Sequence, residues 1–422
     1  MKPKSYKKII LNVLIFFLLS VGFAGCGLFK KKPTEIKDTA LIRIDPSEYP
    51  DFFDDMDYKD LESGIQQSIL YLNRIPPTVK FRFGQDIFNT LSMIRSLEHF
   101  LNFIQTKPSE DQMTNYIKDN YLVYTSMGID HPGQVFFTGY YEPVLEGSLK
   151  KDETYKFPIY TRPDDLTTID LSLFSPKFQG ETIIGRYANQ TVVPYYDRKE
   201  IENEGLLEGK TGVIAWLKDR IDLFFLQVQG SGKIHLDNGK IIDVHYQATN
   251  GQPYRSIGKL LVDEGKIPIE EISMQKIRDY LHQHPEEIET ILNYNPSYVF
   301  FKIEQNGPVG CLEVRLTPGR SIALDRHLYP AAGLAFIETQ KPSMNSDGTI
   351  QKWMAFSRFV LNQDTGGAIS GPGRADIFWG NGPYAEITAG HMQEFGSLYF
   401  LILKPDNLRS NNTENGFDFG AG

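Results

Sequence analysis

Apolar residues in the first folded part of the chain recur at the spacing of helices. One face of an expected helix is formed by Leu61, Ile65, Ile69 and Leu72. The same period predicts a second helix, whose apolar face is formed by Ile87, Leu91, Ile94, Leu97 and Leu101. A third helix is expected to begin at Ser109, because Gln112 stands at the distance that a capping box requires. The pattern predicts a helical N-terminal part.

After this part the pattern is typical of strands. Runs of β-branched and aromatic residues predict strands at 135–141, 223–229, 241–244 and 297–303. The pair Asn238-Gly239 favours a hairpin with a type I′ turn, since both central residues of that turn need a positive φ. One or two helices are expected between Tyr254 and Leu292, and their domain membership stays open. No repeat of about 20 to 50 residues is visible in the sequence, which argues against a solenoid or a propeller.

Both ends of the chain differ in composition from its body. Residues 1–25 combine a basic start, a short apolar run and small residues, which is typical of an export signal peptide. A transmembrane helix is the alternative, but roughly 20 apolar residues are needed to span a bilayer and this run is shorter. Residues 26–50 have the polar, proline-containing composition of a linker. The polar tail at 408–422 is predicted to be disordered.

The segment Ala24-Gly25-Cys26 resembles the lipobox of bacterial lipoproteins, in which the signal is cut before a cysteine whose thiol then carries lipid. The resemblance implies lipidation of Cys26 and anchoring on a periplasmic membrane face. In a Gram-negative cell Gly27 favours the outer membrane, since it is not the aspartate that retains lipoproteins in the inner membrane. Cys311 is then the only other cysteine, so no intramolecular disulfide is available. It lies in an apolar, strand-like run and is expected to be a buried, inert thiol.

Charge and motif content exclude several functional classes. The chain has a formal net charge of −9 and no basic run beyond Lys30-Lys31-Lys32, which argues against nucleic acid as a partner. It contains no His-Glu-x-x-His, Cys-x-x-Cys, Gly-x-Ser-x-Gly or P-loop motif, and its closest histidines, His282 and His284, do not form a convincing ligand set. We predict no metal and no cofactor.

The density of glycine, aspartate and aromatic residues near the C-terminus marks a candidate site. Asp376 is followed by Ile377, Phe378 and Trp379, so its carboxyl is expected to lie beside apolar surface. Desolvation raises the pKa of such a carboxyl and lets it remain a proton donor near neutral pH. The alternative is that Asp376 and Asp364 cap turns at strand ends, and spacing alone favours that alternative.

Several motifs together resemble one family of cell-wall enzymes. Three aspartate segments, at 321–325, 364–369 and 374–378, resemble the three-aspartate module of those enzymes. Four further segments resemble signatures of the membrane-bound lytic transglycosylase A family: Thr-Gly-Tyr-Tyr-Glu-Pro at 138–143, Val-Gln-Gly-Ser-Gly at 228–232, Asn-Gly-Gln-Pro-Tyr at 250–254 and Asn-Pro-Ser-Tyr-Val-Phe-Phe at 295–301. The resemblance covers about residues 60 to 405, and the motifs occur in the family's order.

The resemblance implies a fold and a domain organisation. We expect a mainly β, α+β chain in which a double-psi β-barrel domain is interrupted by a second β-rich domain, with a substrate groove between them. The barrel domain, including the helical part, would take 51–142 and 298–407, and the inserted domain would take 143–297.

The implied activity is lytic cleavage of the β-1,4 bond between N-acetylmuramic acid and N-acetylglucosamine in peptidoglycan, with 1,6-anhydromuramyl products. Asp376 would act first as the acid and then as the base, so one carboxyl would serve both steps. Asp364 carries over as a second catalytic-site aspartate with a supporting role. The substrate-binding residues expected from the motifs are Thr138, Tyr141, Glu142, Gln229, Ser231, Tyr254, Asp325 and Trp379. The implied partners are glycan strands and, through the lipid, a membrane, and the chain is expected to be a monomer.

Two alternatives to this activity stay open. Asp364-Thr365-Gly366 also resembles the active-site triplet of aspartic proteases, but that chemistry needs two such aspartates and the chain has one triplet. A non-catalytic glycan-binding lipoprotein could keep every motif, although the presence of an aspartate at 376 argues against it.

Overall fold

The computed structural model describes residues 40–305 and 307–410. The predicted signal peptide, the lipidation residue Cys26 and the first part of the linker lie outside the described residues, as do residues 411–422 of the predicted tail. Within the described part of the chain, no helix has the length and apolar composition needed to cross a membrane.

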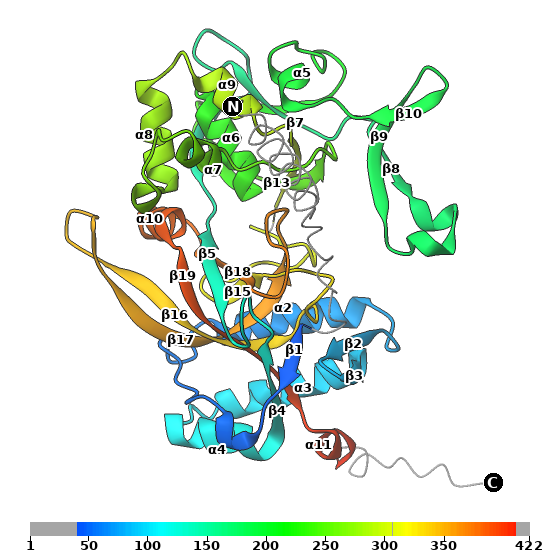
Figure 1. Cartoon of the computed structure of the whole chain (residues 1–422), viewed down its shortest axis with the longest axis vertical. Coiled ribbons are helices and arrows are strands. Elements are labelled where there is room, and N and C mark those ends of the chain that lie inside the picture. Colours follow the sequence, from blue (N-terminus) through cyan, green and yellow to red (C-terminus); the bar gives the residue numbers. More distant parts are fainter. Residues whose placement is uncertain (1–39, 306, 411–422) are drawn as a thin grey trace, which may run out of the picture. The chain divides into compact units, whose positions relative to one another are not determined.

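A closed six-stranded barrel holds the candidate site. Its strands follow the order β19-β16-β17-β15-β18-β5, and a pairing between β5 and β19 closes the ring (Figure 1). Their bounds are β5 Val135–Tyr140, β15 Ser321–Ala323, β16 Leu334–Met344, β17 Ile350–Asp364, β18 Arg374–Phe378 and β19 Glu394–Leu403. The pairs β15–β17 and β18–β5 are parallel and the others antiparallel. Two more strands, β4 (Tyr121–Ser126) and β1 (Leu41–Arg43), extend the sheet beyond β19.

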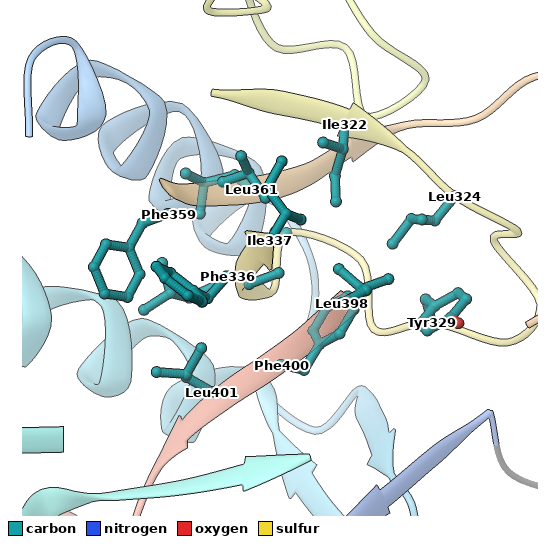
Figure 2. Packing of buried hydrophobic residues seen from close by; sticks show 14 of the residues in the cluster. Ile322, Leu324, Tyr329, Phe336, Ile337, Phe359, Leu361, Leu398, Phe400 and Leu401 are labelled. Carbon is teal, nitrogen blue, oxygen red and sulfur yellow. The ribbon is translucent and has the colours of Figure 1, made fainter. Parts of the chain in front are cut away.

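Apolar side chains pack on both faces of the barrel strands (Figure 2). Phe336 of β16 and Phe359 and Leu361 of β17 share the face on which Phe359 contacts Phe100 of α3. Ile337 of β16 and Phe400 of β19 lie on the opposite face, because side chains alternate along a strand. Each of these side chains is at most 1% exposed. Burial of a side chain of this size contributes about 1.5–3 kcal/mol, so this cluster holds the strands that carry the site in register.

Three helices cover the barrel, and their prediction is confirmed in part. The bounds are α2 Leu61–Arg74, α3 Thr90–Ile104 and α4 Glu110–Asn120, and a small hairpin of β2 (Lys80–Phe83) and β3 (Asp86–Asn89) precedes α3. The capping box at Ser109 is confirmed, because Ser109 and Gln112 exchange both of its hydrogen bonds. The expected apolar face of α3 is wrong at Ile87, which lies in β3, and at Leu91, which is exposed.

The buried face of α3 is instead formed by Met93, Leu97, Phe100 and Ile104. Asn89 caps this helix by accepting a hydrogen bond from the backbone of Ser92, which fixes its start after Ile87. The apolar period therefore correctly predicts a helix in this segment. It also includes Ile87, which lies before the N-cap residue Asn89.

The chain between β5 and β15 forms a second six-stranded sheet in the order β14-β13-β12-β6-β11-β7. Its strands are β6 Val144–Ser148, β7 Phe157–Tyr160, β11 Val213–Leu217, β12 Ser231–Leu236, β13 Ile241–Thr249 and β14 Val299–Glu304. The expected strands at 241–244 and 297–303 are confirmed. A separate sheet joins β8 (Thr167–Asp170), β9 (Thr182–Ala188) and β10 (Thr191–Pro194). The predicted α+β fold, with a β-barrel interrupted by a second β-rich part, is confirmed.

The expected strand at 223–229 is wrong, because this segment is helix α6 (Arg220–Gln229). Asp219 caps its first turn by accepting a hydrogen bond from the backbone of Ile221, and Gly230 ends it with a φ of +80°. An apolar run of this length is compatible with a buried helix or a buried strand, so periodicity does not distinguish them. The helix is buried on most sides, so its sequence lacks the polar face that would distinguish a helix from a buried strand.

Three helices follow β13, not one or two, namely α7 (Ile257–Asp263), α8 (Met274–Gln283) and α9 (Ile288–Asn293). Their apolar residues share a core cluster with Ile221, Phe224 and Phe225 of α6. The remaining helices are α5 Arg198–Glu202, α10 Pro383–His391 and α11 Pro405–Ser410, and the 3-10 turns are η1 Pro46–Glu48, η2 Leu171–Leu173, η3 Pro176–Phe178 and η4 Ile269–Glu271.

Three smaller expectations are corrected. The hairpin between β12 and β13 has a positive φ at Gly239 alone, and Gly239 N–H donates to the Leu236 carbonyl, so its turn is not type I′. Residues 408–410, placed in the disordered tail, belong to α11. Cys311 is exposed and lies outside any strand. Desolvation of its thiol by neighbouring protein atoms, together with the negative charge of Asp364, nevertheless raises the pKa of that thiol to about 12.

Candidate active site

The parallel register of β18 and β5 places Asp376 beside Thr138. The two residues are paired across the strands, and Thr138 Oγ1 donates a hydrogen bond of 2.8 Å to Oδ1 of Asp376. Side chains at every second position of a strand share a face, so Arg374 lies on the same side of β18 as Asp376. Its Nη2 donates to Thr138 Oγ1 at 3.3 Å. These three side chains form a chain of donors that ends on the Asp376 carboxyl.

The short strand β15 brings Asp364 next to Asp376. Ala323 of β15 is paired with Asp376 on one side and with Asp364 on the other. Residues paired directly across strands point to the same face of a sheet, so both carboxyls flank the small Ala323 side chain. Residues twelve positions apart in the sequence thus meet because β17 and β18 lie on opposite sides of β15.

Asp364 accepts hydrogen bonds on both of its oxygens. The Tyr140 hydroxyl donates to Oδ2 at 2.8 Å, and the backbone N–H groups of Cys311 and Thr365 donate to Oδ1 at 2.9 Å each. Burial raises the pKa of Asp364, while these three donors oppose that rise by favouring the charged form. Asp364 is therefore held in position by donors on both of its carboxyl oxygens.

Asp376 has a different environment. Among the described residues, the only hydrogen bond to its carboxyl is the one from Thr138 to Oδ1. Desolvation by the surrounding protein raises its pKa to about 6, and the negative charge of Asp364 adds to that rise. The Thr138 hydrogen bond and the positive charge of Arg374 oppose it. A carboxyl with this pKa can carry a proton at near-neutral pH and can also release it, which confirms the expected effect of apolar surroundings on Asp376.

Asp325 does not join this pair. Its Oδ1 accepts from the backbone of His327 at 3.0 Å, and its Oδ2 accepts from the backbone of Gly371 at 2.9 Å. Both carboxylate oxygens therefore hold together the loops that follow β15 and precede β18. This geometry supports a structural role for Asp325 and argues against the expected direct contact with substrate.

The side chains of Tyr141 and Glu142 are buried against protein. Tyr141 is 2% exposed and its hydroxyl donates to Glu386, while its backbone N–H donates to the Gln229 side chain at 3.0 Å. Glu142 is 1% exposed, accepts from Asn381 and lies 3.5 Å from the Lys233 ammonium. Burial raises the pKa of Glu142. These contacts join the end of β5 to the inserted sheet and to α10, and they argue against direct sugar contact by either side chain.

Trp379, which is expected to offer its ring as a sugar platform, is largely buried in the structure. Trp379 is 9% exposed and its ring packs edge-on against Phe356 and Tyr384. Gly139 lies so close that a Cβ there would approach the indole nitrogen to 2.6 Å. The glycine in the Thr-Gly-Tyr-Tyr motif is thus required for tight packing on Trp379.

The remaining expected binding residues differ in exposure. Gln229 is partly exposed at the end of α6, and Ser231 is 5% exposed at the start of β12. Tyr254 is 40% exposed, so it retains an accessible surface. Of the predicted residues, the structure brings Thr138, Asp364 and Asp376 into one cluster, and it joins Tyr141 to Gln229.

Sequence reasoning missed Tyr140 and Arg374. Both stand two positions from a predicted site residue in the same strand, Tyr140 after Thr138 and Arg374 before Asp376. The alternation of side chains along a strand was a signal that could have selected them, because residues two apart share a face. The backbone N–H of Cys311 left no such signal, since its role depends on tertiary structure.

Comparisons with known proteins agree with the motifs. Residues 136–302 match the family model of the MltA specific insert domain, and residues 320–402 match the model of the 3D domain. The chain is 32% identical over 282 residues to the membrane-bound lytic murein transglycosylase A of Vibrio cholerae, covering 66% of this chain and 68% of that protein. It is 34% identical over 281 residues to the protein of the same name from Escherichia coli K12, with the same two coverages.

Solved structures show the same similarity. A membrane-bound lytic murein transglycosylase from Agrobacterium tumefaciens has a TM-score of 0.71 at 30% identity, and the match covers 88% of this chain and all of that one (100%). The structure of E. coli MltA with bound chitohexaose has a TM-score of 0.65 at 25% identity, covering 88% of this chain and 96% of that one.

Proposed function

The chain belongs to the membrane-bound lytic murein transglycosylase A family, and from that membership we propose that Asp376 is its catalytic acid and base. The protein is a lytic transglycosylase that acts on peptidoglycan. It cleaves the β-1,4 bond between N-acetylmuramic acid and N-acetylglucosamine and forms 1,6-anhydromuramyl ends. The observation that carries the assignment of Asp376 is its environment, a partly exposed carboxyl with a pKa near 6 beside a second, fully hydrogen-bonded carboxylate.

In the first step the protonated Asp376 donates its proton to the glycosidic oxygen. The bond between that oxygen and C1 of the muramic acid breaks, and positive charge develops at C1. Oδ1 of Asp376 is occupied by the Thr138 hydrogen bond, so Oδ2 is the oxygen that carries the proton. Asp364 lies on β17, on the other side of β15 from Asp376, where it is paired with Ala323. In its ionised form it contributes negative charge that favours the developing cation.

In the second step the ionised Asp376 takes the proton of the muramic acid C6 hydroxyl as O6 forms a bond to C1. The carboxyl returns to its protonated state, so the cycle is closed without water or a second carboxyl. The nucleophile belongs to the substrate, and an intramolecular attack of this kind can remove several kcal/mol, up to about 7–11, from the barrier.

Substrate binding is proposed for a groove between the barrel domain, 51–142 and 298–407, and the inserted domain, 143–297. The double-psi connection of the barrel is part of the same proposal. Thr138 and the partly exposed Gln229 and Tyr254 are the residues that their exposure and position best support. Ser231 stands two residues beyond Gln229 and completes this surface in the proposal.

Anchoring is proposed through lipid on Cys26, with the catalytic part on the periplasmic face of the outer membrane of a Gram-negative cell. The relatives are named membrane-bound, and the described residues contain no helix able to cross a membrane. The names of these relatives support attachment to a membrane. We also propose that the protein acts as a monomer.

Mass spectrometry of the products released from purified sacculi tests the proposal. The signal-free protein is expected to release anhydromuropeptides, and the matched variants Asp376→Ala and Asp376→Asn are expected to release none above background. Reducing-end products would show a hydrolase instead. Sacculi left intact but bound by all three proteins would support the alternative of a glycan-binding module.

A further inference from the structure

Arg374 lies next to the proposed catalytic pair and within the motif segment 374–378, but it is not one of the site residues expected from the sequence. It occupies the first position of β18, and its guanidinium carbon lies 4.9 Å from the centre of the Phe136 ring on the neighbouring strand β5. This ring contact and the partial burial of Arg374 restrict where the guanidinium can lie. The side chain is thus held on the face of the sheet that carries Asp376.

The hydrogen bond from Arg374 to Thr138 determines the direction of the hydrogen bond between Thr138 and Asp376. A guanidinium has donors and no acceptor, so in the 3.3 Å contact Thr138 Oγ1 can only accept. A threonine hydroxyl has a single hydrogen, and with a lone pair engaged by Arg374 that hydrogen points to Oδ1 of Asp376, 2.8 Å away. Thr138 is therefore a donor to Asp376.

We propose that Arg374 is a positioning residue, which orients the Thr138 hydroxyl as a donor to Oδ1 of Asp376 and so directs the catalytic proton to Oδ2. This proposal rests on the proposed role of Asp376. With Oδ1 engaged, the proton is presented from one defined oxygen at the start of the reaction. The same donor stabilises the carboxylate that forms after the proton has been transferred.

The charge of Arg374 adds a second effect on the same carboxyl. The groups that face Asp376 are Asp364 on β17, Thr138 and Tyr140 on β5 and Arg374 on β18 itself, with the Cys311 thiol near Asp364. Arg374 is the only cation in this set of described residues. Its positive charge lowers the pKa of Asp376, against desolvation and Asp364, which raise it. Loss of the cation therefore leaves Asp376 protonated to a higher pH.

A double-mutant cycle on isolated glycan strands tests this role. The proteins compared are wild type, Arg374→Met, Thr138→Val and the double variant, with Arg374→Lys to restore the charge and Arg82→Met, an exposed arginine of β2, as control. Arg374→Met is expected to lower kcat about 10- to 100-fold with KM within about twofold. In the Thr138→Val background the same substitution is expected to have less than about threefold effect, because its target hydroxyl is gone.

The pH profile of kcat/KM supplies a readout that a merely structural role would not move. The alkaline limb is expected to shift to higher pH in Arg374→Met and to return toward the wild-type position in Arg374→Lys. Equal effects of Arg374→Met with and without Thr138, together with an unmoved alkaline limb, would overturn the proposal. Circular dichroism and thermal melting identify a variant that fails to fold, and Arg374→Lys then carries the comparison. Failure of the wild type to form anhydro products would instead refute the function of Asp376 itself.

Discussion

The Tyr140 hydroxyl donates a hydrogen bond of 2.8 Å to Oδ2 of Asp364. With the two backbone donors on Oδ1, this bond occupies both oxygens of the carboxylate. Asp376, across Ala323, accepts one side-chain donor among the described residues and has a pKa of about 6. Two carboxyls on either side of β15 thus have different hydrogen-bond donors, and Asp376 is the one that we propose exchanges a proton.

The rate should fall as pH rises through the pKa of Asp376. The resting enzyme needs a protonated Asp376, and a raised pKa keeps it protonated up to about pH 6. Above that value the acid form is depleted, so kcat/KM should drop about tenfold for each further pH unit. Initial rates of anhydromuropeptide release from about pH 4 to pH 8 measure this limb. A rate that stays constant through pH 8 would contradict the assignment of Asp376 as the acid.

Removal of the Tyr140 hydroxyl should lower activity and move the alkaline limb to lower pH. The Tyr140 hydrogen bond lowers the pKa of Asp364, so Tyr140→Phe raises that pKa and makes Asp364 neutral more often. The negative charge that raises the pKa of Asp376 is then reduced, and that pKa falls. We expect about a tenfold loss of kcat/KM at neutral pH, equivalent to about 1.4 kcal/mol.

Tyr124→Phe is the matched control for Tyr140→Phe. The Tyr124 hydroxyl also donates to a carboxylate, Oδ2 of Asp86, at 2.7 Å, but it lies in the part of the sheet beyond the barrel. Both variants should lose about 1–3 kcal/mol of stability from the missing hydrogen bond, and only Tyr140→Phe should shift the pH profile. Equal shifts in both variants would show a general effect on the fold.

A methyl group at position 139 should destabilise the barrel. A Cβ on Gly139 would lie 2.6 Å from the Trp379 indole nitrogen and 3.0 Å from Cα of Ala389 in α10. Because one of these contacts is backbone, the strand or helix must shift, and Gly139→Ala should lower the free energy of unfolding by about 1–3 kcal/mol. Urea unfolding measures the change. Gly367→Ala, where a Cβ meets nothing within 4 Å, should stay within about 0.5 kcal/mol of wild type.

The buried pair of Asp54 and Arg320 should be the most sensitive ion pair of the barrel. Both side chains are at most 1% exposed, and the two guanidinium contacts are 2.6 and 2.8 Å long. Asp54→Ala leaves Arg320 charged and buried without its carboxylate, which should cost about 3–5 kcal/mol. Glu208→Ala, which breaks an exposed pair with Lys151, should change stability by less than about 1 kcal/mol. Chemical denaturation of both variants compares them, and similar losses would contradict the dependence on burial.

Local sequence signals were sufficient for several elements because the deciding interactions are local. The capping box of Ser109 and Gln112 needs only residues three apart, and the period of α2 is visible in its own residues. The apolar residues after Asp376 correctly predicted a raised pKa, and burial of this carboxyl is the largest cause of that rise.

The family motifs predicted part of the candidate site, which the local signals did not. They selected Asp364, Asp376 and Thr138, which the structure brings into one cluster. They did not separate side chains that are open to a ligand from side chains that are buried or hydrogen-bonded to the protein, as Trp379 and Asp325 are. Both kinds occur in the same short segments, so only burial and hydrogen-bond partners separate them.

The sequence by itself determined the helical start of the barrel part, the later strands, the acidic character of the chain and the carboxyl that is proposed to act. Only the tertiary structure decided that 220–229 is a helix, since its apolar run suits either a buried helix or a strand. It also decided that β15 lies between Asp364 and Asp376, and that Tyr140 donates to Asp364 while Arg374 donates to Thr138. Strand order and register are set by packing between distant segments, and a local pattern does not contain them.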